Sequence, residues 1–190
     1  MNRISDKQTD WAKLFRSWIG DLTVALAQGG QPQAAFQAFD GVCAMAFGHR
    51  LFTILAWQSG SDELERVYTS RPAEYPLSAR KRMGPTAWGS HVLRGGHAWL
   101  GESPKDLQWA FPDYELIASL GCGSCLSVPV RWNKTVLGAV SVLDAEGAYQ
   151  KADLDLVDVM SGFLVGPLLE QRAARRGADA YLHSDQWKRT

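Results

Sequence analysis

The sequence is poor in cysteine, balanced in charge and free of long apolar runs, and each of these features excludes a class of protein. Three cysteines in 190 residues are too few, and odd in number, for a disulfide framework, so we expect a reducing compartment. Twenty Lys and Arg balance twenty Asp and Glu, which argues against nucleic acid as a partner because phosphate neutralisation needs a basic excess. No window approaches the roughly 18 apolar residues of a membrane span, and the N-terminus lacks the apolar stretch of a signal peptide. We therefore expect a cytoplasmic protein that binds neither nucleic acid nor membranes.

The remaining composition is that of a globular domain. Hydrophobic residues make up 46% of the chain and charged residues 21%, which excludes an extended disordered protein. A domain of this size can bury roughly 70% of the surface that its unfolded chain exposes, so it needs no disulfides to fold. We divide the chain into an N-terminal helical segment, 1–30, a domain, 31–170, and a polar C-terminal tail, 171–190, which we expect to be frayed.

Apolar residues at helical spacing predict helices at both ends of the chain. Pro32 suits the first turn of a second helix, and a long C-terminal helix follows the last predicted strand. Gly166-Pro167 is expected to kink that helix, because proline removes a backbone donor. The first helix carries the broadest apolar stripe, which consists of Trp11, Leu14, Phe15, Trp18, Ile19, Leu22 and Leu26.

Alternation with a period of two predicts a set of strands between these helices. Asn133-Lys134 is a plausible two-residue hairpin turn between the last two strands. The segment 71–85 is rich in proline and lacks periodicity, which indicates a long loop of the kind that often acts as a lid. The order of elements indicates an α+β fold with an antiparallel sheet. The predicted strands are 49–57, 63–70, 97–101, 125–131 and 136–143.

Two runs near the end of the sheet resemble a known family. The run Ser119–Val130, SLGCGSCLSVPV, and the run Val136–Leu143, VLGAVSVL, look like the C-terminal half of a GAF domain, and Phe111-Pro112-Asp113 upstream also resembles that family. The similarity covers about residues 31–170. It implies a central antiparallel sheet with the N- and C-terminal helices packed on one face and a loop-covered ligand pocket on the other.

The resemblance implies ligand binding but names no ligand. The sequence lacks the NKFDE motif of cyclic-nucleotide-binding members and the cysteine spacing of members that reduce free methionine sulfoxide. We expect a sensory or regulatory module that binds a small organic molecule and acts without an attached output domain. No cofactor is expected.

Aromatic residues gather in the segment that should cover the pocket. Trp88, His91, Trp99, Phe111 and Tyr114 are expected to line one cavity, because small-ligand pockets combine aromatic walls with a few polar groups. The alternative is that these residues merely seal the open face of the sheet.

Two charged residues complete the candidate ligand site. Arg80, in the run Arg80-Lys81-Arg82, could hold a carboxylate or phosphate, although a basic loop is more often simply solvated. Asp113 lies near the pocket and is expected to cap the helix that begins at Tyr114. Asp113 and Glu115 lie two residues apart on a helix and do not face each other, so they make a poor acid–base pair.

Cys122 and Cys125 form a C-x-x-C motif with three interpretations. A redox pair normally opens a helix after a strand, whereas here a helix ends before the pair and a strand follows. A structural zinc site needs four ligands. The third interpretation, which we favour, is that the thiols are inert packing residues; a thiol-based redox enzyme using Cys122 or Cys125 stays an alternative function. No nucleophile with a base and an orienting group is visible, and we assign no catalytic residue and no metal ligand.

The apolar stripes of the terminal helices exceed what a sheet face needs. One face of each helix can serve the core, and the surplus would be exposed unless a second copy covers it. We expect a homodimer in which the terminal helices of two chains pack together. One alternative is a monomer in which the two apolar stripes pack on each other. Another is a module that dimerises without binding any ligand.

Overall fold

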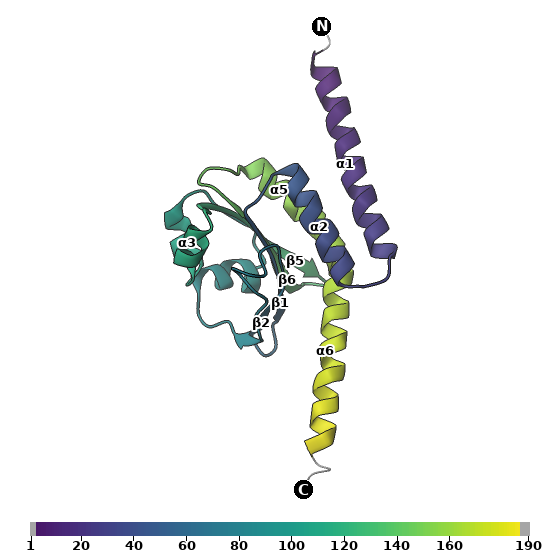
Figure 1. Cartoon of the computed structure of the whole chain (residues 1–190), viewed down its shortest axis with the longest axis vertical. Coiled ribbons are helices and arrows are strands. Elements are labelled where there is room, and N and C mark those ends of the chain that lie inside the picture. Colours follow the sequence, from purple (N-terminus) through teal and green to yellow (C-terminus); the bar gives the residue numbers. More distant parts are fainter. Residues whose placement is uncertain (1–2, 187–190) are drawn as a thin grey trace.

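A six-stranded antiparallel sheet forms the centre of the protein (Figure 1). The computed structural model describes residues 3–186 of the chain, with side chains from residue 12 to residue 175. The strand order is β3-β2-β1-β6-β5-β4, which confirms the predicted α+β fold with an antiparallel sheet. The strands are β1 (Leu51–Gln58), β2 (Glu63–Thr69), β3 (Lys81–Arg82), β4 (Trp99–Gly101), β5 (Ser124–Trp132) and β6 (Thr135–Asp144).

Helices from both ends of the chain form the layer on one face of the sheet (Figure 1). Phe52, Ile54 and Ala56 of β1 point into this layer because alternate side chains of a strand lie on opposite faces. Each fully buried apolar side chain contributes roughly 1.5–3 kcal/mol to stability, and this layer holds the largest cluster of them. The helices are α1 (Arg3–Ala27), α2 (Gln33–Ala46), α5 (Lys151–Met160) and α6 (Val165–Gln186).

The predicted single C-terminal helix is interrupted. A 3₁₀ turn, η2 (Ser161–Leu164), separates α5 from α6 and lies before the expected kink at Gly166-Pro167. Pro167 falls in the first turn of α6, where a backbone N–H has no intrahelical partner, so the helix tolerates it.

The expected fraying from residue 171 is also wrong as far as Gln186, where α6 ends. Two arginines tie α6 to the sheet, because Arg172 donates to the carbonyls of Trp57 and Val136 and Arg175 pairs with Glu65. The end of the predicted tail, 187–190, lies outside the described residues.

The opposite face of the sheet carries a second layer of loops and short helices. This layer contains the loop 71–85 together with η1 (Gly89–Arg94), α3 (Pro104–Ala110) and α4 (Tyr114–Ser119). The prediction that 71–85 is a long loop holds except for the two-residue strand β3. Within residues 3–186, no helix combines the length and the apolar character that crossing a membrane requires.

The hairpin between β5 and β6 turns at Asn133-Lys134, as the sequence predicts. Both residues have positive φ, 46° and 60°, and Trp132 pairs with Thr135 across the turn. Two consecutive positive φ angles are the mark of a type I′ turn, whose twist matches that of the flanking strands.

Candidate functional site

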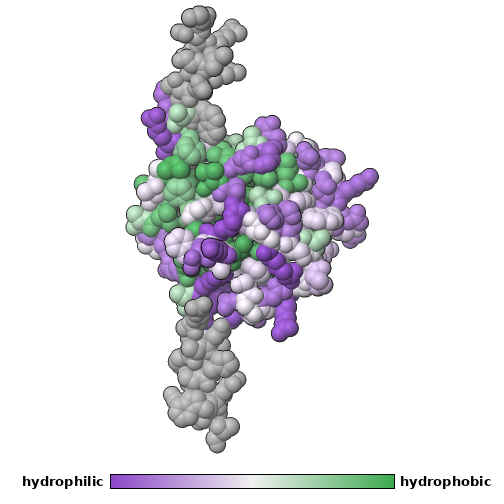
Figure 2. Space-filling view, turned by 180° about the vertical axis from the view of Figure 1, so that it is seen from behind, coloured by the Kyte–Doolittle hydropathy of each residue, from purple (hydrophilic) through white to green (hydrophobic). Residues whose placement is uncertain are grey.

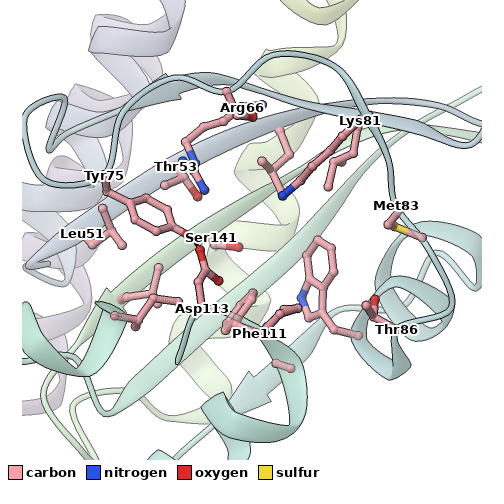
Figure 3. A pocket seen from close by; sticks show the side chains of 18 residues that line it. Leu51, Thr53, Arg66, Tyr75, Lys81, Met83, Thr86, Phe111, Asp113 and Ser141 are labelled. Carbon is pink, nitrogen blue, oxygen red and sulfur yellow. Dashed lines mark hydrogen bonds between the residues drawn. The ribbon is translucent and has the colours of Figure 1, made fainter. Parts of the chain in front are cut away.

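A cavity lies between the sheet and the second layer (Figure 3). Its volume is about 120 Å³. A cavity of roughly 150 Å³ can hold a benzene ring, so this one accepts a group of about that size. Strands β1, β2 and β6 form the floor, and the loop 71–85, Trp88 and the segment 110–117 form the walls and roof.

The floor of the cavity combines leucine side chains with a row of hydroxyl groups. Thr53 of β1 pairs in register with Ser141 of β6, and Ser141 pairs with Ser127 of β5, so the three lie side by side across the sheet. All three are buried. The Ser127 and Ser141 hydroxyls are 2.8 Å apart, and the indole Nε1 of Trp88 donates to Ser127 Oγ over 3.0 Å. The floor therefore has a row of hydroxyl groups that crosses the strands, with leucine side chains on both sides of the row.

A bulge in β2 turns Arg66 toward the cavity. Strict alternation would place Arg66 and Tyr68 on the same face of the sheet. The pairing of β1 with β2 slips between Ile54 and Leu55, which leaves one residue of β2 unpaired. Tyr68 therefore points into the helix layer, where its hydroxyl donates to Asp40 over 2.7 Å, while Arg66 lines the cavity.

Arg66 is held by the loop that covers the cavity. Its guanidinium lies 3.6 Å from the centre of the Tyr75 ring, and its Nη1 donates to the Pro76 carbonyl over 2.6 Å. Its backbone N–H donates to the hydroxyl of Ser78 in the same loop. The Nε atom is buried and has no hydrogen-bond partner. An unpaired buried donor costs free energy, so this atom is a local cost of the packing around Arg66.

Tyr75 joins the loop to the first residues of α4. Its hydroxyl donates to the Asp113 carboxylate over 2.6 Å, and the residue is only 7% exposed. Burial, together with the bond to Asp113, raises the pKa of Tyr75 well above its ordinary value, so the hydroxyl remains a donor. Asp113 occupies the N-cap position of α4, as expected, but its side chain makes no cap bond because it accepts from Tyr75.

Lys81 is the second cation of the cavity. It lies on β3, and Figure 3 shows its side chain extending from that strand over the cavity. Its neighbour Arg82 lies on the same strand but not in the lining, as alternation along a strand requires.

Three of the seven predicted ligand residues line the cavity, namely Trp88, Phe111 and Asp113. Trp88 and Phe111 also contact each other, with ring centres 5.8 Å apart. No bound molecule tests these assignments, so ligand binding by these residues stays a prediction.

The other four predicted residues lie outside the lining, which corrects the expectation of one shared cavity. His91 is exposed because η1 is a π-helix, whose i→i+5 bonding removes the shared face with Trp88 that an α-helix would give. Trp99 stacks on Trp109 outside the cavity. The Tyr114 hydroxyl points to Glu115 at the surface, and Arg80 lies 4.0 Å from Glu63.

The sequence offered partial signals for the residues it missed. The basic run predicts Arg80 as the ligand contact, whereas the structure places its neighbour Lys81 in the lining. Tyr75 lies in the predicted lid without a feature that marks it. The direction of the Arg66 side chain depends on the β2 bulge, and no residue near Arg66 indicates a bulge in the sequence. Ser141 sits in a strand whose two faces are both largely apolar.

The two cysteines of the C-x-x-C motif are buried, free thiols. Cys125 lies on β5 and faces the second layer, away from Leu126 and Val128, as alternation predicts. Burial, and secondarily Asp144, raises the pKa of Cys122 to about 11, and burial raises the pKa of Cys125 further. Raised pKa values disfavour the thiolate, which is the reactive form.

Among the side chains described, from residue 12 to residue 175, no group of three or more His, Cys, Asp or Glu is placed to hold a metal ion. The polar groups of the cavity can bind and orient a molecule.

Comparisons with known proteins agree on the fold. The sequence matches no protein-family model and no curated protein. The structure is similar to the GAF domain of a phosphoenolpyruvate-protein phosphotransferase from Coxiella burnetii, with a TM-score of 0.66 and 14% identity over 88% of this chain and 96% of that one. The corresponding Acinetobacter domain has the same TM-score and identity over 91% and 97%. The free methionine-R-sulfoxide reductase of Neisseria meningitidis, solved in complex with its substrate, has a TM-score of 0.61 and 17% identity over 83% and 89%.

Proposed function

We propose that the chain, which has the fold of a GAF domain, is a sensory or regulatory module that binds a small organic molecule in the cavity beneath the loop 71–85. The observation that carries the proposal is the mixed lining: Arg66, Lys81 and the Ser141 hydroxyl lie among apolar walls. Small-molecule sites combine a mostly apolar surface with a few such convergent polar groups.

The similar structures support this proposal at the level of the fold. The neisserial enzyme holds a substrate, which demonstrates that one protein of similar fold accommodates a small molecule. Fold similarity does not carry a ligand from one protein to another, so the proposal rests on the cavity of this chain.

The thiol enzyme is the weaker alternative. Its nucleophile would be Cys122 or Cys125, and the raised pKa values of both thiols oppose that role. The expectations that the protein is cytoplasmic and acts without an attached output domain stay predictions.

The binding proposal is tested by mass spectrometry of the folded protein purified from its own host. We expect a small molecule to be retained, and its addition at 100 times its dissociation constant should stabilise the fold by about 2.7 kcal/mol. The variant Leu64→Trp adds bulk to a partly exposed wall of the cavity and removes no hydrogen bond, so it should abolish retention. Leu77→Trp is the matched control, because Leu77 is 59% exposed and outside the lining. Equal retention by both variants would contradict the proposal.

We also propose that two copies of the chain associate through α1. Trp18 and Leu22 are buried in the core. Leu14, however, is 53% exposed, and Val24 and Leu26 are also exposed. Figure 2 shows apolar surface close to where α1 meets the body of the protein. The side chain of Trp11, which belongs to the predicted stripe, lies outside the described residues.

Sedimentation equilibrium tests this association. We expect a dimer mass for the unchanged chain and a folded monomer for Leu14→Glu with Leu26→Glu, because both side chains are exposed in the single chain. Leu116→Glu, on α4, is a control that changes an exposed leucine far from α1 in the fold. A monomer mass for the unchanged chain would overturn the proposal.

A further inference from the structure

The charges that face the cavity are unequal. Arg66 and Lys81 contribute two positive charges and Asp113 one negative charge, which leaves a net charge of +1. The Asp113 carboxylate already accepts from Tyr75. Among the side chains described, from residue 12 to residue 175, no carboxylate forms an ion pair with Arg66 or Lys81. The cavity therefore has unpaired positive charge at one end.

The polar atoms at this end are hydrogen-bond donors. Arginine and lysine can only donate, and the Lys81 side chain has no hydrogen-bond or ion-pair partner among the described residues. The Trp88 indole also only donates, so Ser127 accepts from it and can pass its own proton to Ser141. In that arrangement the Ser141 proton is left for another acceptor, which is either the neighbouring Cys125 sulfur or a group bound in the cavity. Donors of this kind favour an acceptor with negative charge.

Most of the remaining lining is apolar, apart from Thr53, Ser78 and Thr86, and it limits the size of the bound group. At about 120 Å³ the cavity is close to the roughly 150 Å³ that holds a benzene ring. An inorganic anion would leave these walls uncovered. The apolar side chains that face the cavity include Leu51, Leu55, Leu64, Phe111, Ile117 and Leu143.

We infer that the ligand is a small organic carboxylate with one ring or a short branched chain. Its carboxylate faces Arg66 and Lys81, and its apolar part lies on the leucine-rich floor. The inference rests on the proposed function, because it names the ligand class of the same cavity.

The test is a titration with three probes of matched shape: benzoate, benzamide and benzylamine. The signal is the NMR cross-peak of the Trp88 indole N–H, which donates to Ser127 beside the cavity and is assigned by its loss in Trp88→Phe. We expect benzoate to shift this peak with a dissociation constant about tenfold or more below that of benzamide, since a charged hydrogen bond is worth that factor. Benzylamine and inorganic phosphate should leave the peak unchanged.

Variants separate the charge from the shape of the cavity. Lys81→Gln should weaken benzoate about fivefold or more and leave benzamide unchanged, because the Lys81 side chain has no hydrogen-bond or ion-pair partner in the described part of the chain. Arg66→Gln should weaken benzoate more strongly, but it also removes the bond to Pro76, so Lys81→Gln decides. Lys105→Gln, on an exposed turn of α3, is the matched control and should change nothing.

Each outcome has one meaning. If benzamide or benzylamine binds as tightly as benzoate, the carboxylate inference is overturned and the binding proposal stands. If inorganic phosphate binds as tightly, the apolar part of the inference is wrong. If none of the probes shifts the Trp88 peak, the carboxylate inference is contradicted, and the binding proposal is decided by the retention experiment with Leu64→Trp and Leu77→Trp.

Discussion

Replacing Tyr75 with phenylalanine tests whether the bond from the loop 71–85 to α4 holds the cavity closed. The hydroxyl donates to Asp113 over 2.6 Å, and the Tyr75 ring is buried, so the change removes the bond and keeps the packing. A hydrogen bond to a charged group contributes about 1.5–3 kcal/mol. Asp113 is only half-buried and water can replace the lost donor, so the lower end of this range applies. We expect the free energy of unfolding to fall by about 1.5 kcal/mol, which lowers Tm by about 3–6 °C in a chain of this size.

Urea unfolding measures this loss, and amide hydrogen exchange locates it. Exchange should become faster in the loop 71–85 and remain unchanged in β5 and β6. Tyr114→Phe is the control, because the Tyr114 hydroxyl makes only an exposed 3.3 Å contact with its neighbour Glu115, and its effect should stay within about 0.5 kcal/mol. Equal losses in the two variants, or unchanged exchange in the loop, would refute the role assigned to Tyr75.

Two further predictions concern stability. The pKa of Cys122 is raised from 9.0 to about 11, chiefly by burial, so the unfolded chain loses this proton first as the pH rises. The contribution of Cys122 to the free energy of unfolding is fully present below about pH 9 and is lost as the pH rises toward 11. Urea unfolding should therefore show that this free energy falls by about 1–2 kcal/mol between these pH values, and by less in Cys122→Ala. In Gly138→Ala a Cβ would lie 1.9 Å from the Leu55 carbonyl oxygen, so we expect a loss of about 3 kcal/mol in thermal unfolding. Gly162→Ala, where a Cβ meets nothing within 4 Å, should be neutral or slightly stabilising, and a similar loss there would contradict this explanation.

The fold could be predicted from the sequence because its strongest signals are local. The period of two places Phe52 and Ile54 on one face of β1 and Leu51 on the other, and the structure keeps this division. The turn at Asn133-Lys134 was visible because asparagine tolerates positive φ. The resemblance to GAF domains rested on such elements and their order, and the fold confirms it.

The errors came where tertiary packing decides the local structure. The π-helix at Gly89–Arg94 has the composition of an ordinary helix, so the shared face of Trp88 and His91 was the natural prediction. The C-terminal helix breaks at Ser161, before the Gly166-Pro167 pair that predicts a kink. Leu164, in the 3₁₀ turn at the break, is buried in the core.

The site was only partly predictable for the same reason. Aromatic crowding correctly placed Trp88 and Phe111 at the cavity, since large side chains cover an open sheet face. The charges were missed because their direction depends on long-range pairing: Arg66 on the β2 bulge, and Lys81 on a two-residue strand that forms by pairing with β2.

The central claim, that the cavity binds a small molecule, is tested most directly at the Trp88 indole N–H. The cross-peak is recorded before and after addition of the small-molecule fraction of the host. We expect a saturable shift in the unchanged chain and in Leu77→Trp, and no shift in Leu64→Trp, whose added ring fills the cavity. A Trp88 peak that does not move in the unchanged chain, or that moves equally in Leu64→Trp, would contradict the claim.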